Sequence, residues 1–126
     1  MIKTYGITNK DFPYLTAAVD QNGKKVLVNS SKKMNDYMSP AQMLEVAVAS
    51  CLTMTTKGVL YSHGITYRDV HVSAKIDVNE ESSHIHLSVE IDADLDDQLK
   101  EEYIQEAYNK CYVRNVLTHP ITSSLE

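Results

Sequence analysis

The longest run of apolar and small residues in the chain covers positions 43–54, and capping residues lie on both sides of it. Ser39 can cap a helix, and Gln42 can complete a capping box with Ser39. Gly64 offers the left-handed residue that often ends a helix. The pattern therefore predicts a helix over residues 39–63. Because apolar or small side chains cover almost every face of this helix, we expect other elements to pack around it on all sides.

The second clear pattern is an alternation of apolar and polar residues with the period of a β-strand, in two stretches joined by a short polar loop. Pairing Val70 with Ile91 and Ile76 with Ile85 places the apolar side chains of both stretches on one face. The same register leaves histidines, serines and charged residues on the other face, with opposite charges across from each other. The pattern predicts an antiparallel hairpin over residues 67–93.

A shorter alternation lies near the start of the chain, over residues 12–29. Asn22-Gly23 at its centre favours a two-residue type I′ turn, so the segment is predicted to form a β-hairpin. Its apolar positions are Leu15, Ala17, Val19, Val26 and Val28.

A second helix is predicted over residues 96–111, after the central hairpin. Asp96 or Asp94 can cap it, and the acids in its first turns suit the positive end of the helix dipole. The helical pattern continues weakly to Leu117, and Ile121 is expected in a short final strand.

The order of these elements predicts an α+β fold, with antiparallel sheets wrapped around a long buried helix. A length of 126 residues suits a single domain that covers residues 1–126. The two hairpins can cover only part of the apolar helix. We therefore expect a second copy of the chain to supply the remaining cover.

Charge is distributed unevenly along the chain. Residues 1–40 carry six lysines against three acids, a net of +3, and residues 41–126 carry six basic groups against fourteen acids, a net of −8. The acidic body disfavours nucleic acid as a partner. The first residues lack the apolar segment of a secretory signal, and the apolar run at positions 43–54 is too short to span a bilayer. We therefore expect a cytoplasmic protein without a membrane partner.

The two cysteines, Cys51 and Cys111, are sixty residues apart and form no Cys-x-x-Cys pattern, which disfavours a zinc site or a structural disulfide. Cys51 falls in the middle of the predicted central helix. Burial there would raise the pKa of its thiol, so a reactive Cys51 would need a cation from another element. His84 and His86 alternate on the polar face of the central hairpin, where solvated histidines are a better interpretation than a metal site.

Two segments carry a family resemblance. They are Ser39-Pro40-x-x-Met43-Leu44-x-x-Ala47-Val48-Ala49-Ser50-Cys51-Leu52-x-Met54 and Ala107-Tyr108-Asn109-Lys110-Cys111-Tyr112-Val113. With the hairpin between them and the spacing of the two cysteines, the chain closely resembles the OsmC/Ohr family over residues 40–121. The resemblance implies an intertwined homodimer, in which sheets from both chains wrap two central helices.

The resemblance also implies the thiol-dependent reduction of organic hydroperoxides. Cys51 would attack the peroxide oxygen and become a sulfenic acid, and Cys111 would condense with it to a disulfide. An external dithiol would then reduce the disulfide. The family mechanism implies no cofactor and no metal.

Three features differ from the family pattern. The family has an arginine in its N-terminal strands, a glutamate ten residues before the first cysteine, and Cys-Pro-Val at the second. This chain has no arginine before Arg68, Ala41 at the glutamate position, and Tyr112 in place of the proline. Without a guanidinium partner, we expect Cys51 to stay largely protonated at neutral pH and to react slowly with peroxide.

Three cations are candidates to support the thiols. Lys24 or Lys25 of the first hairpin could approach Cys51, although an ammonium lacks the planar fork of a guanidinium. Arg114 lies about one helical turn beyond Cys111 and could tune that thiol.

Two other functions are open on the sequence alone. A dimer of the same fold could bind a small apolar ligand or sense the thiol redox state without reducing peroxides efficiently. A purely structural or interaction dimer is the other alternative.

Overall fold

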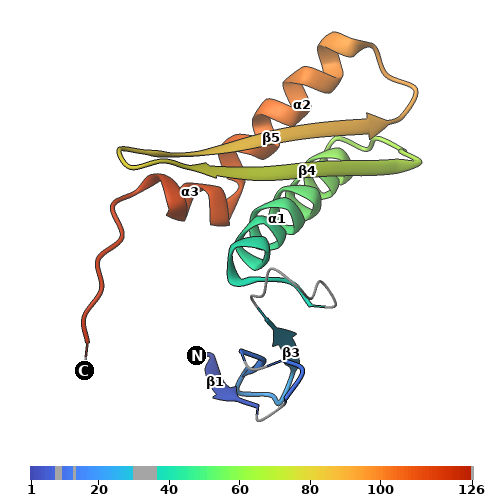
Figure 1. The fold of residues 1–126 in the computed structure, drawn as a ribbon. Coiled ribbons are helices and arrows are strands. Elements are labelled where there is room, and N and C mark those ends of the chain that lie inside the picture. Colours follow the sequence, from blue (N-terminus) through green and yellow to red (C-terminus); the bar gives the residue numbers. More distant parts are fainter. Residues whose placement is uncertain (8–9, 13, 30–36, 126) are drawn as a thin grey trace. The chain divides into compact units, whose positions relative to one another are not determined.

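The structure is a computed structural model and describes residues 1–7, 10–12, 14–29 and 37–125. The chain divides into two compact units, Met1–Leu44 and Glu45–Glu126. Its elements are β1 (Lys3–Gly6), β2 (Thr16–Val19), β3 (Lys25–Val28), α1 (Pro40–Ser62), β4 (Asp69–Val78), β5 (Ser83–Asp92), α2 (Asp97–Lys110) and α3 (Tyr112–Thr118). Antiparallel sheets and helices confirm the α+β class (Figure 1). The single domain stays a prediction.

The caps of α1 confirm the predicted boundaries of the long helix. The Ser39 backbone N–H donates to Gln42 Oε1 at 2.9 Å, and the Gln42 backbone N–H donates to Ser39 Oγ at 3.2 Å. This is the reciprocal pair of a capping box. At the other end Gly64 adopts a φ of 67°, and the Ile65 N–H reaches the Leu60 carbonyl at 2.9 Å. That bond forms the Schellman stop that the glycine permits.

The hydroxyl groups of α1 are satisfied within the helix itself. Ser50, Thr53, Thr55 and Thr56 each donate to the carbonyl four residues earlier, at 2.6–2.8 Å. Thr56 is fully buried, so its bond to the Leu52 carbonyl removes what would be an unpaired polar group in the core. Because their hydroxyl groups are paired within the helix, these four residues can stand in α1, one face of which is buried in the second unit.

In the second unit, β4 and β5 form the predicted hairpin with the predicted register. Val70 pairs with Ile91, and Ile76 pairs with Ile85. The apolar face of this hairpin packs against buried residues of both long helices, among them Leu52, Val59 and Ala107. Figure 1 shows the hairpin with α1 and α2 beside it. The core of the unit therefore lies between these helices and one face of the hairpin.

The C-terminal part of the chain differs from its prediction in two ways. Asp96 caps α2 as expected, since its side chain accepts the Leu99 N–H at 2.8 Å. The helix does not continue weakly through the second cysteine, because Cys111 has an extended backbone (ψ 110°) and separates α2 from the distinct helix α3. Ile121 lies in no strand, so the prediction of a short final strand was wrong.

The first unit contains a sheet in the order β1-β2-β3, of which only β2 and β3 were predicted. The prediction of a type I′ turn was wrong. Such a turn needs a positive φ at both central residues, and only Gly23 has one (81°), whereas Asn22 does not. Gly23 N–H donates to the Asp20 carbonyl and Asp20 N–H to the Lys24 carbonyl, which is a three-residue loop.

The longer loop shifts the pairing of β2 with β3 by one residue. A two-residue turn at Asn22-Gly23 would set Val19 opposite Val26, but the structure pairs Val26 with Ala18. A shift of one residue moves a strand's side chains to the opposite face of a sheet. Val26 and Val28 therefore share a face with Thr16 and Ala18, not with Ala17 and Val19.

One stripe of α1 is exposed in the single chain. Val46, Ser50, Met54, Lys57 and Tyr61 follow one another at helical spacing and are all exposed; Met54 is 70% and Tyr61 85% exposed. The single chain thus leaves part of this helix uncovered, as expected, and cover by a second copy stays a prediction.

By length and hydropathy alone, α1 could cross a membrane. Core helices of soluble proteins meet the same test, and α1 buries one face in the second unit. The buried residues are Val48, Leu52, Thr56, Val59 and Leu60. We therefore describe α1 as the core helix of a soluble fold.

The core of the second unit gives a stability prediction. Leu60 is 0% exposed and packs with Val70, Ile91 and Ala93. Leu60→Ala should lower the free energy of unfolding by about 2–5 kcal/mol, because the deletion leaves a cavity. Urea denaturation at one protein concentration measures the change. Val78→Ala, at a residue that is 74% exposed, should change it by less than about 0.5 kcal/mol. Equal effects of the two substitutions would contradict this description of the core.

Candidate functional site

The structure brings Cys51 and Cys111 together in one cluster of the second unit. Cys111 is 0% exposed and belongs to the buried core, and Cys51 is half-buried and packs against that core. Both thiols are free, and each shifts the pKa of the other. Two residues sixty positions apart in the sequence are thus neighbours in the fold.

Each cysteine owes its position to a different element. Cys51 lies in the middle of α1, between the exposed stripe and the buried face that contains Leu52. Cys111 lies at the joint where α2 ends and α3 begins. The first backbone N–H groups of a helix have no acceptor within that helix, so those of Tyr112 and Val113 are available to another partner.

Cys51 is that partner. Burial is the largest single influence and raises the pKa of the Cys51 thiol, but hydrogen bonds together outweigh it, so the pKa lies below the ordinary thiol value of 9.0. In order of decreasing effect, the donors are the Val113 backbone N–H, the Cys111 thiol, the Thr55 hydroxyl and the Tyr112 backbone N–H. These donors favour the thiolate because each directs a partial positive charge at the sulfur.

The Thr55 hydroxyl lowers the pKa of Cys51 less than its place in this order suggests. A hydroxyl carries one proton, and the Thr55 hydroxyl also donates to the Cys51 carbonyl at 2.8 Å. It can serve the carbonyl or the thiolate at one moment, but not both. The Val113 N–H is shared in the same way, because it also lowers the pKa of Cys111. The Tyr112 N–H acts on Cys51 and is not among the groups that lower the pKa of Cys111.

The pKa of Cys111 moves in the opposite direction. Burial is again the largest influence and raises it, the neighbouring Cys51 raises it further, and the backbone N–H groups of Arg114 and Val113 only partly compensate. The two thiols therefore differ: Cys51 is partly accessible and more acidic, and Cys111 is buried and less acidic.

Backbone and side-chain hydrogen bonds lower the pKa of Cys51 among the described residues of the single chain. The expectation that an activated Cys51 also needs a cation stays a prediction. The Arg114 guanidinium lies 3.9 Å from the centre of the Tyr108 ring and donates to Asn115 Oδ1 at 2.8 Å. The backbone N–H of Arg114 lowers the pKa of Cys111.

Lys24 and Lys25 are exposed at the β2–β3 loop and the start of β3, in the first unit. The Lys24 backbone N–H donates to Asp20 Oδ1 at 2.9 Å, which belongs to the loop structure. A role for either ammonium at Cys51 stays a prediction.

The polar face of the β4–β5 hairpin carries the other group of titratable residues. His86 Nε2 lies 2.8 Å from Asp77 Oδ2, and His71 Nε2 lies 3.1 Å from Asp69 Oδ2. The predicted register does set His71 opposite Glu90 and Asp77 opposite His84. The ion pairs, however, join His71 to Asp69 and His86 to Asp77. In the described part of the chain, no three His, Cys, Asp or Glu side chains are placed to hold a metal ion together.

Sequence reasoning missed three of the groups that bond Cys51: Tyr112, Val113 and Thr55. The Thr55 signal was available, because a residue four positions later lies on the same helix face. For Tyr112 and Val113, the signal in the sequence was that position 112 is not the proline of the family pattern. That signal could be interpreted only once the helix break at Cys111 was known.

The comparisons with known proteins agree on one family. A family model described as OsmC-like protein matches residues 33–126. No curated protein sequence matches the chain. Solved structures do match, with low sequence identity.

An OsmC-like protein from Mycoplasma pneumoniae superposes with a TM-score of 0.78 and 17% identity, over 93% of this chain and 85% of that chain. An organic hydroperoxide resistance protein from Legionella pneumophila gives 0.69 and 15%, over 94% and 88%. One from Elizabethkingia anophelis, with bound thiocyanate, gives the same four values. At these identities the superpositions show the fold. Because the family model covers well over half of the chain, the protein belongs to the OsmC-like family.

Proposed function

We propose that this protein reduces organic hydroperoxides with Cys51 as the attacking thiol and Cys111 as the resolving thiol. The single observation that carries the proposal is the division of properties between the two sulfurs. Cys51 is half-buried with a lowered pKa, and Cys111 is fully buried with a raised pKa. The names of two structural relatives, organic hydroperoxide resistance proteins, point to the same class of substrate.

The reaction divides into three steps. The Cys51 thiolate attacks one oxygen of the hydroperoxide, the O–O bond breaks, and the alkoxide takes a proton and leaves as an alcohol. Cys51 is then a sulfenic acid, whose sulfur is attacked by Cys111, and water leaves as the disulfide forms. An external dithiol reduces the disulfide by two thiol–disulfide exchanges and restores both thiols.

The departures from the family pattern acquire a physical meaning in this scheme. A proline at position 112 would have no backbone N–H, whereas Tyr112 has one and donates it to Cys51. The extra donor stabilises the thiolate in a chain that has Ala41 at the family's glutamate position and no arginine before Arg68. A hydrogen bond stabilises a thiolate less than a full positive charge does, so we expect moderate activity.

A homodimer completes the proposal. The exposed stripe of α1 contains Met54 and Tyr61, which are mostly exposed in the single chain, and large exposed apolar patches mark interaction surfaces. A second copy that covers this stripe would enclose the side of α1 next to Cys51. With an external dithiol as reductant, such a protein would act in the cytoplasm.

The function is tested by single-turnover oxidation of the reduced protein with cumene hydroperoxide between pH 5 and 9. Because hydrogen bonds lower the pKa of Cys51, the rate should rise with pH and level off below 9.0. Cys111→Ser should stop at the sulfenic acid, which a dimedone adduct at Cys51 detects by mass spectrometry. Cys51→Ser should abolish the reaction. Oxidation of Cys51→Ser at the rate of the unsubstituted protein would contradict the assignment of the attacking thiol.

The role of the Tyr112 N–H is tested by two substitutions at one position. Tyr112→Pro removes the N–H and should raise the pKa of Cys51, whereas Tyr112→Ala keeps the N–H and should leave that pKa nearly unchanged. The pH dependence of iodoacetamide labelling measures it, and tryptic peptides 34–57 and 111–114 report the two cysteines separately. Equal shifts in both variants would assign the effect to the tyrosine ring instead.

The dimer is tested by light scattering after gel filtration at micromolar concentration. The mass should be about twice 14.2 kDa, with more than about 2,000 Å² buried in total. Met54→Glu places a charge in the exposed stripe of α1 and should weaken association at least tenfold. Val78→Glu, at the far end of β4, serves as the matched control. A monodisperse mass of 14.2 kDa would contradict the dimer.

A further inference from the structure

The joint between α2 and α3 is held by a side chain that plays no part in the three steps of the proposed reaction. Asn115 lies near the start of α3 and is half-buried. Its Nδ2 donates to the Asn109 carbonyl at 3.0 Å, and its Oδ1 accepts from Arg114 Nη1 at 2.8 Å. Its backbone N–H donates to the Cys111 carbonyl at 3.0 Å. Asn115 is therefore bonded both to the end of α2 and to the residue at which the helix breaks.

The Asn109 carbonyl is the group for which the side-chain bond matters. In an α-helix each carbonyl accepts the N–H group four residues later, so an uninterrupted helix would pair the Asn109 carbonyl with the Val113 N–H. In the structure the Asn115 side chain supplies the donor instead. The end of α2 therefore keeps this carbonyl satisfied without the Val113 N–H.

The carbonyl one residue earlier follows the same logic. An uninterrupted helix would pair the Tyr108 carbonyl with the Tyr112 N–H. In the structure the Tyr108 carbonyl accepts the Cys111 N–H at 3.4 Å. The backbone N–H groups of Tyr112 and Val113 are thus not needed at the end of α2, and both act on the Cys51 sulfur and lower its pKa.

The neighbours of the Asn115 amide fix its orientation. A guanidinium only donates hydrogen bonds and a carbonyl only accepts them, so Oδ1 has to face Arg114 and Nδ2 has to face Asn109. The Arg114 guanidinium is itself held, because it lies 3.9 Å from the centre of the Tyr108 ring. Side chains of similar size, such as Leu or an ionised Asp, have no donor for the Asn109 carbonyl. The amide is therefore specific to its place in the joint.

We propose that Asn115 is a positioning residue for the attacking thiol. Its side chain bonds the Asn109 carbonyl in place of the Val113 N–H and so keeps the chain extended at Cys111. The backbone N–H groups that this break releases are then directed at Cys51, and Asn115 acts through them. The inference rests on the proposed function in one respect, because the role of Cys51 as the attacking thiol is what gives these bonds their use.

The test measures how iodoacetamide labelling of Cys51 depends on pH in the reduced full chain, with tryptic peptide 34–57 as the reporter. Asn115→Leu keeps the approximate size of the side chain and removes the donor. The Asn109 carbonyl should then recover the Val113 N–H, and the labelling profile should move to higher pH by about half a unit or more. Val116→Ala, at the neighbouring exposed position of α3, is the matched control and should leave the profile unchanged. An unchanged profile in Asn115→Leu, or an equal shift in Val116→Ala, would overturn the proposal.

A second measurement follows the backbone itself. The ¹³Cα chemical shift of Cys111 distinguishes an extended residue from a helical one, and in Asn115→Leu it should move toward the helical value. Asn115→Ala, which introduces a strong helix former, should show the same change. A Cys111 that stays extended in both variants would overturn the proposal, because another group would then hold the break. Unfolding of both variants would also overturn it, because the side chain would then support the whole fold.

The labelling test uses no peroxide, so failure of this inference and failure of the proposed peroxidase are distinguishable. A labelling profile that shifts in Asn115→Leu, in a protein that does not react with cumene hydroperoxide, would support the positioning role and contradict the peroxidase. A protein that reacts with the peroxide, but whose profile is unchanged in Asn115→Leu, would do the reverse.

Discussion

The packing of α1 on the apolar face of the β4–β5 hairpin is the constraint on which the second unit depends. Leu52, Val59 and Leu60 are buried in that contact. The same hairpin face receives Ala107 of α2 and Cys111, the residue that follows α2. Because both helices must fit one face, the end of α2 arrives beside the middle of α1. The position of Cys51 next to Cys111 is therefore a consequence of core packing, with no local sequence motif that could produce it.

The break of the helix at Cys111 matters as much as the packing. An uninterrupted helix would use the Tyr112 and Val113 N–H groups for its own hydrogen bonds. The extended backbone of Cys111 starts a new helix and frees those groups, which then bond Cys51. The half-buried thiol of Cys51 thus acquires a lowered pKa from neutral donors, in a chain without an arginine in its N-terminal strands. Because N–H groups lower the pKa of Cys51, the loss of one of them, as at position 112, should change that pKa. A full positive charge beside the thiol would make the loss of one N–H less important.

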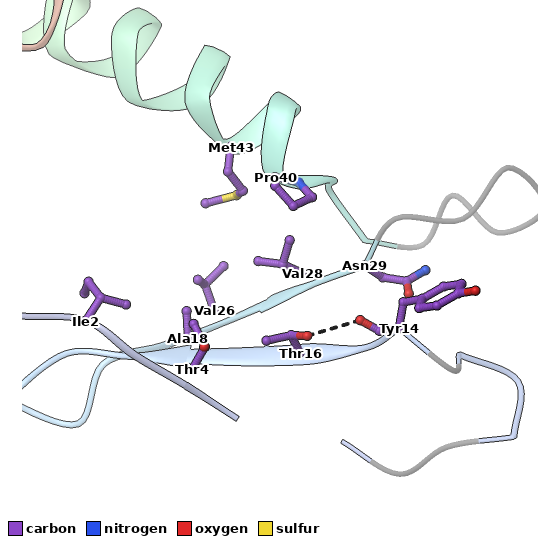
Figure 2. Close-up of a pocket in the computed structure, with 10 residues that line it drawn as sticks. All are labelled: Ile2, Thr4, Tyr14, Thr16, Ala18, Val26, Val28, Asn29, Pro40 and Met43. Carbon is purple, nitrogen blue, oxygen red and sulfur yellow. Dashed lines mark hydrogen bonds between the residues drawn. The ribbon is translucent and has the colours of Figure 1, made fainter. Parts of the chain in front are cut away.

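The first unit shows how a small change in a turn alters the chemistry of a surface. The loop at Gly23 contains three residues, and the register of β2 and β3 follows from it. That register places Val26 and Val28 on the face of the sheet that carries Thr16 and Ala18 (Figure 2). With a two-residue turn the same strand would present its other side chains, Lys25 and Leu27, on that face.

The sequence by itself determined the elements whose signals are local. The capping box at Ser39, the stop at Gly64, the Asp96 cap and the register of Val70 with Ile91 were all predictable, because caps act within one turn and alternation over ten residues has one consistent pairing. The pair of cysteines and the family could also be recognised. The tertiary structure alone decided the rest, since those features depend on contacts between distant segments. They are the helix break at Cys111 and the donors to Cys51. Whether a backbone N–H bonds its own helix or a thiol sixty residues away depends on where packing places that thiol.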